Sequence, residues 1–238
     1  MHNARKPIYR NGLLRRLSPK DLALIEHGLV FCDLPLRMVL EERKAPIEYV
    51  YFLEEGIGSV VAKTPKGRDT EVGLIGFEGM TGAGVVLGDD LPAHECYVQL
   101  AGAAYRLQTR ALLSALSQSP TLRPFLLRYV QALHIQTGYT ALVNARSKLE
   151  ERLARWLLMC DDRVTGEKLT ITHEFLSVML GVRRPGVTVA LQILEGKGFI
   201  RANRGEILLR DREGLIELTD GAYSEPEAEY LRLVGEIG

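Results

Sequence analysis

Residues 172–210 constrain the fold most strongly, because two short helical patterns, a glycine between them and a hairpin pattern follow one another there. Thr172 can cap a helix over His173–Leu180, since a threonine hydroxyl accepts a free N–H of the first helical turn. Gly181 can take the left-handed conformation that ends this helix, and a second helix is predicted over Pro185–Gly196. Two short helices joined by a tight turn that contains glycine are typical of a helix-turn-helix.

A hairpin is predicted directly behind the second helix. Phe199–Ala202 and Glu206–Arg210 have the pattern of strands, and the turn between them carries Arg204 at its tip. Such a hairpin is the wing of a winged helix-turn-helix, whose second helix enters the major groove of DNA with its N-terminal residues at the base edges. Arginine pairs with guanine or phosphate, and glutamine with adenine. The candidate DNA-binding residues are therefore Thr172, Arg183, Arg184, Thr188, Gln192 and Arg204. The basic wing argues against the alternative that they are only solvated side chains of a surface helix.

Charge is unevenly distributed along the chain, although the formal net charge is zero. Residues 171–210 hold six basic and three acidic side chains, whereas residues 211–238 hold eight acidic and two basic ones. A local basic patch can attract phosphate even when the whole molecule is neutral. The acidic tail leaves two alternatives open: a docking surface for another protein, which would make the chain an interaction module, or a final helix packed on the body.

Upstream, the chain has short β-prone runs that are interrupted by glycine and proline. The runs are Tyr49–Leu53, Ser59–Ala62 and Thr70–Ile75, and the interruptions include Gly56 and Gly58. Frequent turns between short strands indicate an antiparallel barrel or sandwich. We expect residues 1–119 to form this first domain.

A long helix is predicted over residues 121–145, where apolar side chains recur every three or four residues. The members of this stripe are Leu122, Leu126, Tyr129, Val130, Leu133, Thr137, Ala141 and Leu142. The stripe fits either a core helix that lies on the β-domain or a seam along which two copies pair. We expect residues 120–146 to contain this helix and a hinge, and residues 147–238 to form the winged-helix domain with its tail.

Several segments together resemble the Crp/Fnr superfamily of transcription regulators. They are Tyr51-Phe52-Leu53-Glu54-Glu55-Gly56, Glu151-Arg152-Leu153-Ala154-Arg155-Trp156-Leu157-Leu158, Leu180-Gly181-Val182-Arg183-Arg184-Pro185, Leu194-Glu195 and Gly198-Phe199-Ile200. The resemblance implies an α+β fold with an N-terminal antiparallel β-barrel of the jelly-roll, cyclic-nucleotide-binding type, a long dimerisation helix and a C-terminal winged helix-turn-helix. It also implies a homodimer on an inverted-repeat operator and admits RNA polymerase as a partner.

The region that corresponds to the family's cyclic-nucleotide pocket departs from the family pattern. The family's Gly-Glu-Leu-Gly turn corresponds to Gly79-Met80-Thr81-Gly82, and the phosphate-binding arginine falls near His94 and Glu95. A buried phosphate needs a cation or several donors, which methionine and glutamate do not supply. Cyclic AMP is therefore not expected, and these six residues are the candidate pocket of an unidentified effector, if there is one. The turn could equally do no more than close the barrel.

The second helix of the helix-turn-helix departs from the family as well. Arg184 matches the family's first base-reading arginine, whereas Pro185 replaces a glutamate and Val189 a later arginine. By the family pattern Arg183 occupies the cap position of this helix. Because a residue before proline favours extended backbone, Arg184 is the alternative N-cap, with its side chain pointing toward DNA.

Other chemistries lack a supporting pattern. Cys32, Cys96 and Cys160 do not have the spacing of a disulfide framework or a metal site. Two alternatives stay open without positive support: haem binding through His27, His94 or His134, and redox sensing at Cys96 or Cys160. No hydrolase elbow, Walker loop or zinc-binding histidine pair is present, so an enzyme is not expected. We expect no cofactor or metal, no signal peptide or membrane span, and a cytoplasmic protein.

Overall fold

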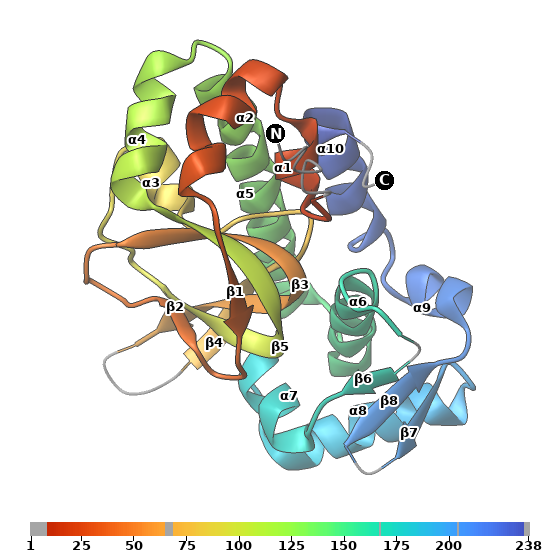
Figure 1. Cartoon of the computed structure of the whole chain (residues 1–238). Helices are drawn as coiled ribbons and strands as arrows, with labels where there is room; N and C mark the ends of the chain where they lie inside the picture. Colours follow the sequence, from red (N-terminus) through yellow and green to blue (C-terminus); the bar gives the residue numbers. More distant parts are fainter. Residues whose placement is uncertain (1–8, 65–68, 167, 204, 236–238) are drawn as a thin grey trace.

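The structure is a computed structural model that describes residues 9–64, 69–166, 168–203 and 205–235 (Figure 1). A sheet-based N-terminal part and a C-terminal part are joined by the long helix α5. The strands are β1 (Val30–Leu34), β2 (Val39–Glu41), β3 (Tyr49–Lys63), β4 (Asp69–Ile75), β5 (Glu95–Gln108), β6 (Lys168–Thr170), β7 (Ile200–Asn203) and β8 (Glu206–Leu209). The helices are α1 (Gly12–Arg16), α2 (Pro19–Ile25), η1 (Glu26–Gly28, 3-10), α3 (Ala83–Leu87), α4 (Thr109–Gln118), α5 (Leu122–Arg146), α6 (Leu149–Asp161), α7 (His173–Met179), α8 (Arg184–Gly196), α9 (Arg212–Leu218) and α10 (Ser224–Val234).

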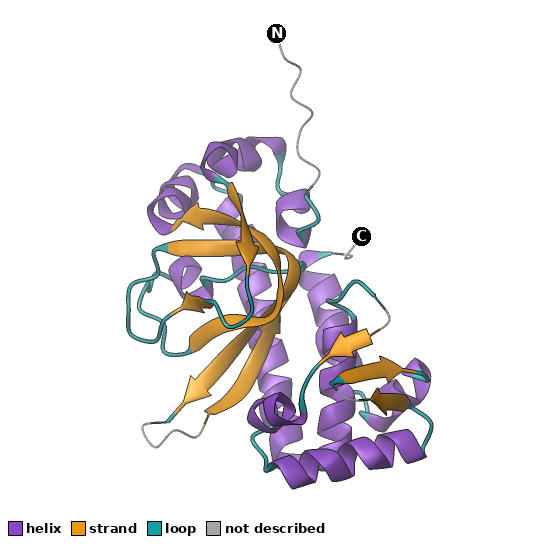
Figure 2. Ribbon diagram, turned by 60° about the horizontal axis from the view of Figure 1, so that its bottom comes forward, coloured by secondary structure: helices purple, strands orange, loops and turns teal. Residues whose placement is uncertain are grey.

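The N-terminal sheet is antiparallel, with the strand order β1-β5-β3-β4 and with β2 also paired to β5. We expected Gly56 and Gly58 to separate two strands, and this is wrong, because β3 runs through both. The register between β3 and β5 shifts around Leu53–Gly58, and Gly56 has a φ of +83°, which side chains with a Cβ rarely tolerate. Such irregularities bend a strand. The glycines therefore curve the sheet rather than end a strand (Figure 2).

The sheet and α5 enclose one hydrophobic core. Phe52 of β3 and Met80 of the β4–α3 connection are buried with Leu126 and Tyr129 of α5. The Tyr129 hydroxyl donates to the Met80 carbonyl at 2.9 Å and accepts the Met80 N–H at 3.0 Å. The predicted α+β fold class, with an antiparallel N-terminal domain, a long helix and a C-terminal helix-turn-helix, is confirmed.

The apolar stripe predicted on α5 divides between two environments. Leu122, Leu126 and Tyr129 are buried in the chain's own core, so the first half of the stripe packs within the chain. Leu142, in the second half, is 50% exposed, and Leu127, outside the predicted stripe, is 38% exposed. The end of the predicted stripe is therefore free, and the free face of α5 also includes Leu127, which the sequence pattern did not pick out.

The acidic tail forms α10, which returns to the N-terminal part of the molecule. Tyr230 and Val234 of α10 share a core with Tyr9 and Leu13, and Figure 1 shows α10 beside α1. The Tyr230 hydroxyl donates to the Glu78 carbonyl at 2.7 Å. Of the two alternatives for the tail, a packed final helix is therefore observed. None of the helices in the described residues is long and apolar enough to cross a membrane.

Candidate nucleic-acid interface

Helices α7 and α8 form the predicted helix-turn-helix. The Thr172 hydroxyl accepts the Phe175 N–H at 3.2 Å and so caps α7, as its position predicted. Gly181 has a φ of +63° in the turn, and the Val182 N–H donates to the Ser177 carbonyl at 2.9 Å. Local sequence is enough to explain this turn, since glycine meets the left-handed conformation without steric cost.

The start of α8 differs by one residue from the prediction. Arg183 has extended backbone (φ −79°, ψ 146°) and is the N-cap, so Arg184 is the first helical residue and Pro185 the second. Of the two N-cap positions that the sequence allowed, Arg183 is observed, and the alternative that Arg184 is the N-cap is wrong. A proline in the first turn is tolerated because its missing N–H would have no helical partner there. Arg183, Arg184 and Pro185 are all exposed at this end of the helix.

One face of α8 is buried and the other is free. The buried side chains are Val187, Ala190, Leu191 and Leu194. Pro185, Val189 and Gln192 are exposed on the opposite side, and Val189 is 55% exposed, whereas Arg184 is exposed at the N-terminal end of the helix. Arg184 and Gln192 are candidates that the sequence predicted, whereas Val189 is not.

Thr188 lies at the edge of the free face and uses its hydroxyl inside the protein. This hydroxyl is 3.2 Å from Nδ1 of His173 on α7 and donates to the Arg184 carbonyl at 3.3 Å. The side chain is half-buried and ties α8 to α7. A position that the sequence suggested for base reading thus already has two partners within the chain.

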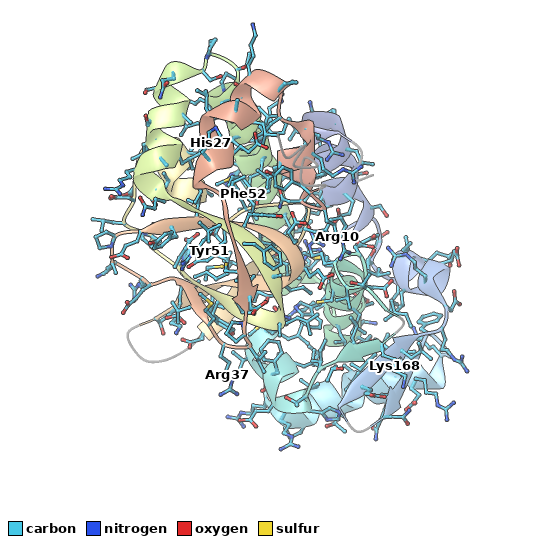
Figure 3. All side chains as sticks on the ribbon, viewed as in Figure 1. Arg10, His27, Arg37, Tyr51, Phe52 and Lys168 are labelled. Atoms are coloured by element: carbon cyan, nitrogen blue, oxygen red, sulfur yellow. The ribbon has the colours of Figure 1, made fainter. Side chains whose placement is uncertain are left out.

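The hairpin behind α8 is formed by β7 and β8, with β6 on the other side of β8. The Ala202 N–H of β7 donates to Glu195 of α8 at 3.0 Å, and this bond fixes the hairpin against the helix. Lys168 of β6, labelled in Figure 3, pairs with Glu206 at 3.1 Å, and Arg201 is exposed. Arg204, predicted at the wing tip, lies outside the described residues.

A scan against protein-family models matches residues 151–218 to the Crp-like helix-turn-helix domain. Residues 151–218 form a Crp-like helix-turn-helix domain. Solved structures of Crp/Fnr-type regulators have the same overall fold as this chain. A Crp/Fnr-family regulator from Eubacterium rectale has a TM-score of 0.69 at 15% identity, over 87% of this chain and 97% of its own.

Two further structures agree with this fold. FixK2 from Bradyrhizobium japonicum has a TM-score of 0.66 at 17% identity, over 80% of this chain and 96% of its own. A CRP-family regulator from Thermus thermophilus has a TM-score of 0.63 at 20% identity, over 79% of this chain and 96% of its own. A search of curated proteins found no match. The resemblance to the Crp/Fnr superfamily is thereby confirmed for the domain and the fold.

The Crp-like domain is attached to the sheet through buried polar contacts. Trp156 of α6 donates from Nε1 to Glu71 of β4 at 2.7 Å, and Ser59 of β3 donates to the other carboxylate oxygen at 2.5 Å. Burial raises the pKa of Glu71 to about 7, and the two hydrogen bonds only partly oppose that effect. Arg152 of α6 donates to the Leu180 carbonyl in the helix-turn-helix turn. The Arg152 bond therefore connects the helix-turn-helix turn to α6, and the Glu71 contacts connect α6 to the sheet.

The turn that replaces the family's sugar-binding segment is packed tightly. Met80 and Thr81 are 0% exposed. The Thr81 hydroxyl accepts the Tyr51 N–H at 3.0 Å. The Gly82 N–H donates to the Glu41 carboxylate at 2.5 Å, and burial raises the pKa of Glu41. A carboxylate of the chain therefore already accepts a backbone donor of this turn.

The second half of the candidate effector pocket lies at the start of β5. His94 is exposed, and Glu95 forms a 2.6 Å ion pair with Lys63. Among the described residues, no hydrogen bond or ion pair joins either of them to residues 79–82.

The buried cysteines sit in apolar surroundings. Burial raises the pKa of the Cys96 and Cys160 thiols well above the ordinary value. Both side chains are at most 1% exposed. A protonated, buried thiol is a poor nucleophile, so these positions favour packing over reactivity.

Proposed function

We propose that the chain is a non-enzymatic, DNA-binding transcription regulator that recognises an inverted-repeat operator as a homodimer. The exposed start and the free face of α8 carry this proposal, because Arg184 at the first helical position and Gln192 on the free face are both exposed on a Crp-like helix-turn-helix. The second helix of this motif enters the major groove in protein–DNA complexes. RNA polymerase, as a further partner, follows only from the family resemblance.

The individual contacts follow from position and chemistry. Arg183 and Arg184 stand at the N-terminal end of α8, where bidentate bonds to guanine or bonds to phosphate are within reach. Gln192 is suited to adenine. Thr172, exposed at the start of α7, and Arg204, which the sequence predicts at the wing tip, would meet the backbone phosphates. Thr188 would act mainly by holding α8 on α7.

The free face of α5 supports the homodimer. Five of its exposed residues follow one another along one side of the helix: Leu127, Gln131, His134, Gly138 and Leu142. Nothing lies within 4 Å of a Cβ built at Gly138, and a glycine at this place lets a second helix approach the backbone closely. Leucines at the two ends of the face supply apolar area, and Gln131 and His134 can donate and accept hydrogen bonds between them. A second copy of α5 would bury this face.

A cyclic nucleotide is not proposed as the effector. The Glu41 carboxylate at the Gly82 N–H would repel an incoming phosphate, and neither Met80 nor the paired Glu95 offers a replacement cation. The regulator would respond to a different ligand, or to none.

Binding of Arg184→Ala to DNA tests the proposed function. The probe is a duplex selected by the purified chain from a library of randomised inverted repeats. Loss of preference for the selected sequence indicates base reading, whereas equal weakening on all sequences, with a salt dependence shallower by about one unit, indicates phosphate contact. Arg110→Ala, which removes the same charge from α4, is the control and should bind normally. Unchanged binding by Arg184→Ala, or selection of no sequence, would contradict the proposal.

A further inference from the structure

Val189 is an apolar side chain at the centre of the free face of α8. Its neighbours along this line are Pro185, four residues before it, and Gln192, three residues after it, so the three lie one above another on the helix. The buried residues Val187 and Ala190 point the other way. A valine that is 55% exposed is otherwise unexplained by packing within the chain.

Few side chains around Val189 are free to form hydrogen bonds with a base that faces the middle of α8. Thr188, next in the chain, has its hydroxyl between His173 and the Arg184 carbonyl. Arg184 begins the helix, in the turn before Val189, and Gln192 lies almost one turn after it. Hydrogen-bonding groups therefore flank an apolar centre that presents only methyl groups to whatever this face binds.

We propose that the methyl groups of Val189 contact the 5-methyl group of a thymine in each half of the operator. This inference rests on the proposed function and names the base that one position of α8 selects. Thymine carries a methyl group in the major groove, and apolar side chains recognise it. Cytosine at the same place presents an amino donor that valine cannot satisfy, and a buried donor without a partner is costly.

The test removes single methyl groups from the DNA. Each thymidine of the selected duplex is replaced in turn by deoxyuridine, which pairs identically but lacks the 5-methyl group. At one thymine per half-site we expect the chain to bind about fourfold more weakly, the factor that corresponds to about 0.8 kcal/mol for one buried methyl group. With Val189→Ala the same replacement should change binding less than about twofold.

Gln192→Ala is the matched control, because it truncates a neighbouring side chain on the same line of α8. It should weaken binding to the thymine duplex but keep the response to deoxyuridine at the Val189 position. Val189→Ala replaces an exposed side chain by a better helix former, so its fold, checked by circular dichroism, should be intact. Absence of any deoxyuridine-sensitive position in a duplex that is bound specifically, or an equal response in the Val189→Ala variant, would overturn the inference and leave the proposed function standing.

Discussion

The indole Nε1 of Trp156 donates a 2.7 Å hydrogen bond to the carboxylate of Glu71, across the boundary between the helix-turn-helix part and the sheet. Glu71 is buried, and Ser59 donates to its second oxygen. The contact joins α6, which packs on α8, to β4, whose Thr70 lies against Gly181 of the helix-turn-helix turn. A protonation event at Glu71 therefore acts where the two parts of the molecule meet.

Glu71→Gln should change the pH dependence of stability. Burial raises the pKa of Glu71 to about 7 from its usual 4.5, so the folded state holds the proton over this range and the unfolded state loses it. The favourable contribution of Glu71 is complete below pH 4.5 and is lost as the pH rises through about 7. The difference corresponds to about 3 kcal/mol.

Urea unfolding of both proteins at about pH 5 and about pH 8 checks this prediction. Glutamine keeps an oxygen that can accept from Trp156 but does not ionise. The variant should therefore gain stability relative to the natural chain as the pH rises. A difference between the two proteins that stays constant across this range would contradict the prediction.

Arg163→Met should destabilise the fold strongly. Arg163 donates to Glu78 at 2.8 Å, and the two side chains are only 4% and 6% exposed. Removal of the cation leaves a buried carboxylate without its partner, which typically costs about 3–5 kcal/mol. The free energy of unfolding in urea is the measurement.

Two controls separate charge from packing at this site. Arg163→Met combined with Glu78→Gln should recover much of the lost stability, because no isolated charge then remains. Lys168→Met breaks the exposed pair with Glu206 and should cost less than about 1 kcal/mol. Equal losses for the buried and the exposed pair would show that burial does not govern the effect.

Tyr230→Phe should loosen α10. The Tyr230 hydroxyl donates a buried hydrogen bond of 2.7 Å to the Glu78 carbonyl. Its removal leaves that carbonyl without this donor, which should lower the free energy of unfolding by about 1–2 kcal/mol. Tyr139→Phe is the control, because that hydroxyl has no hydrogen bond among the described residues, and it should cost less than about 0.5 kcal/mol. DNA affinity should stay unchanged, since α10 and α8 lie at opposite ends of the molecule (Figure 1). The two variants losing equal stability would show that the bond to Glu78 contributes nothing.

Leu142→Arg should separate the homodimer that we propose. Leu142 is 50% exposed on α5, so a charged replacement leaves the monomer folded but places a cation in the seam between two copies. Sedimentation equilibrium should show a monomer at concentrations where the natural chain and Leu142→Met are dimers. A Leu142→Arg protein that stays dimeric would place the interface elsewhere.

Local sequence determined the helix-turn-helix, because its signals act within a few residues. Thr172 caps its own helix, Gly181 supplies the left-handed turn, and the spacing of Val187, Leu191 and Leu194 marks one buried face of α8. The long helix, predicted over residues 121–145, is observed as α5 within one residue at each end. These features depend on backbone geometry and on periodicity, and both can be recognised in one sequence.

Only the tertiary structure decided what each apolar face and polar group meets. Periodicity predicts that Leu122 and Leu126 are buried, but it does not say whether by the chain's own sheet or by a second copy. Glu71 reaches Trp156 across 85 residues, and Tyr230 reaches Glu78 across 152. Such pairs depend on how distant elements pack together, and no local pattern in the chain encodes them.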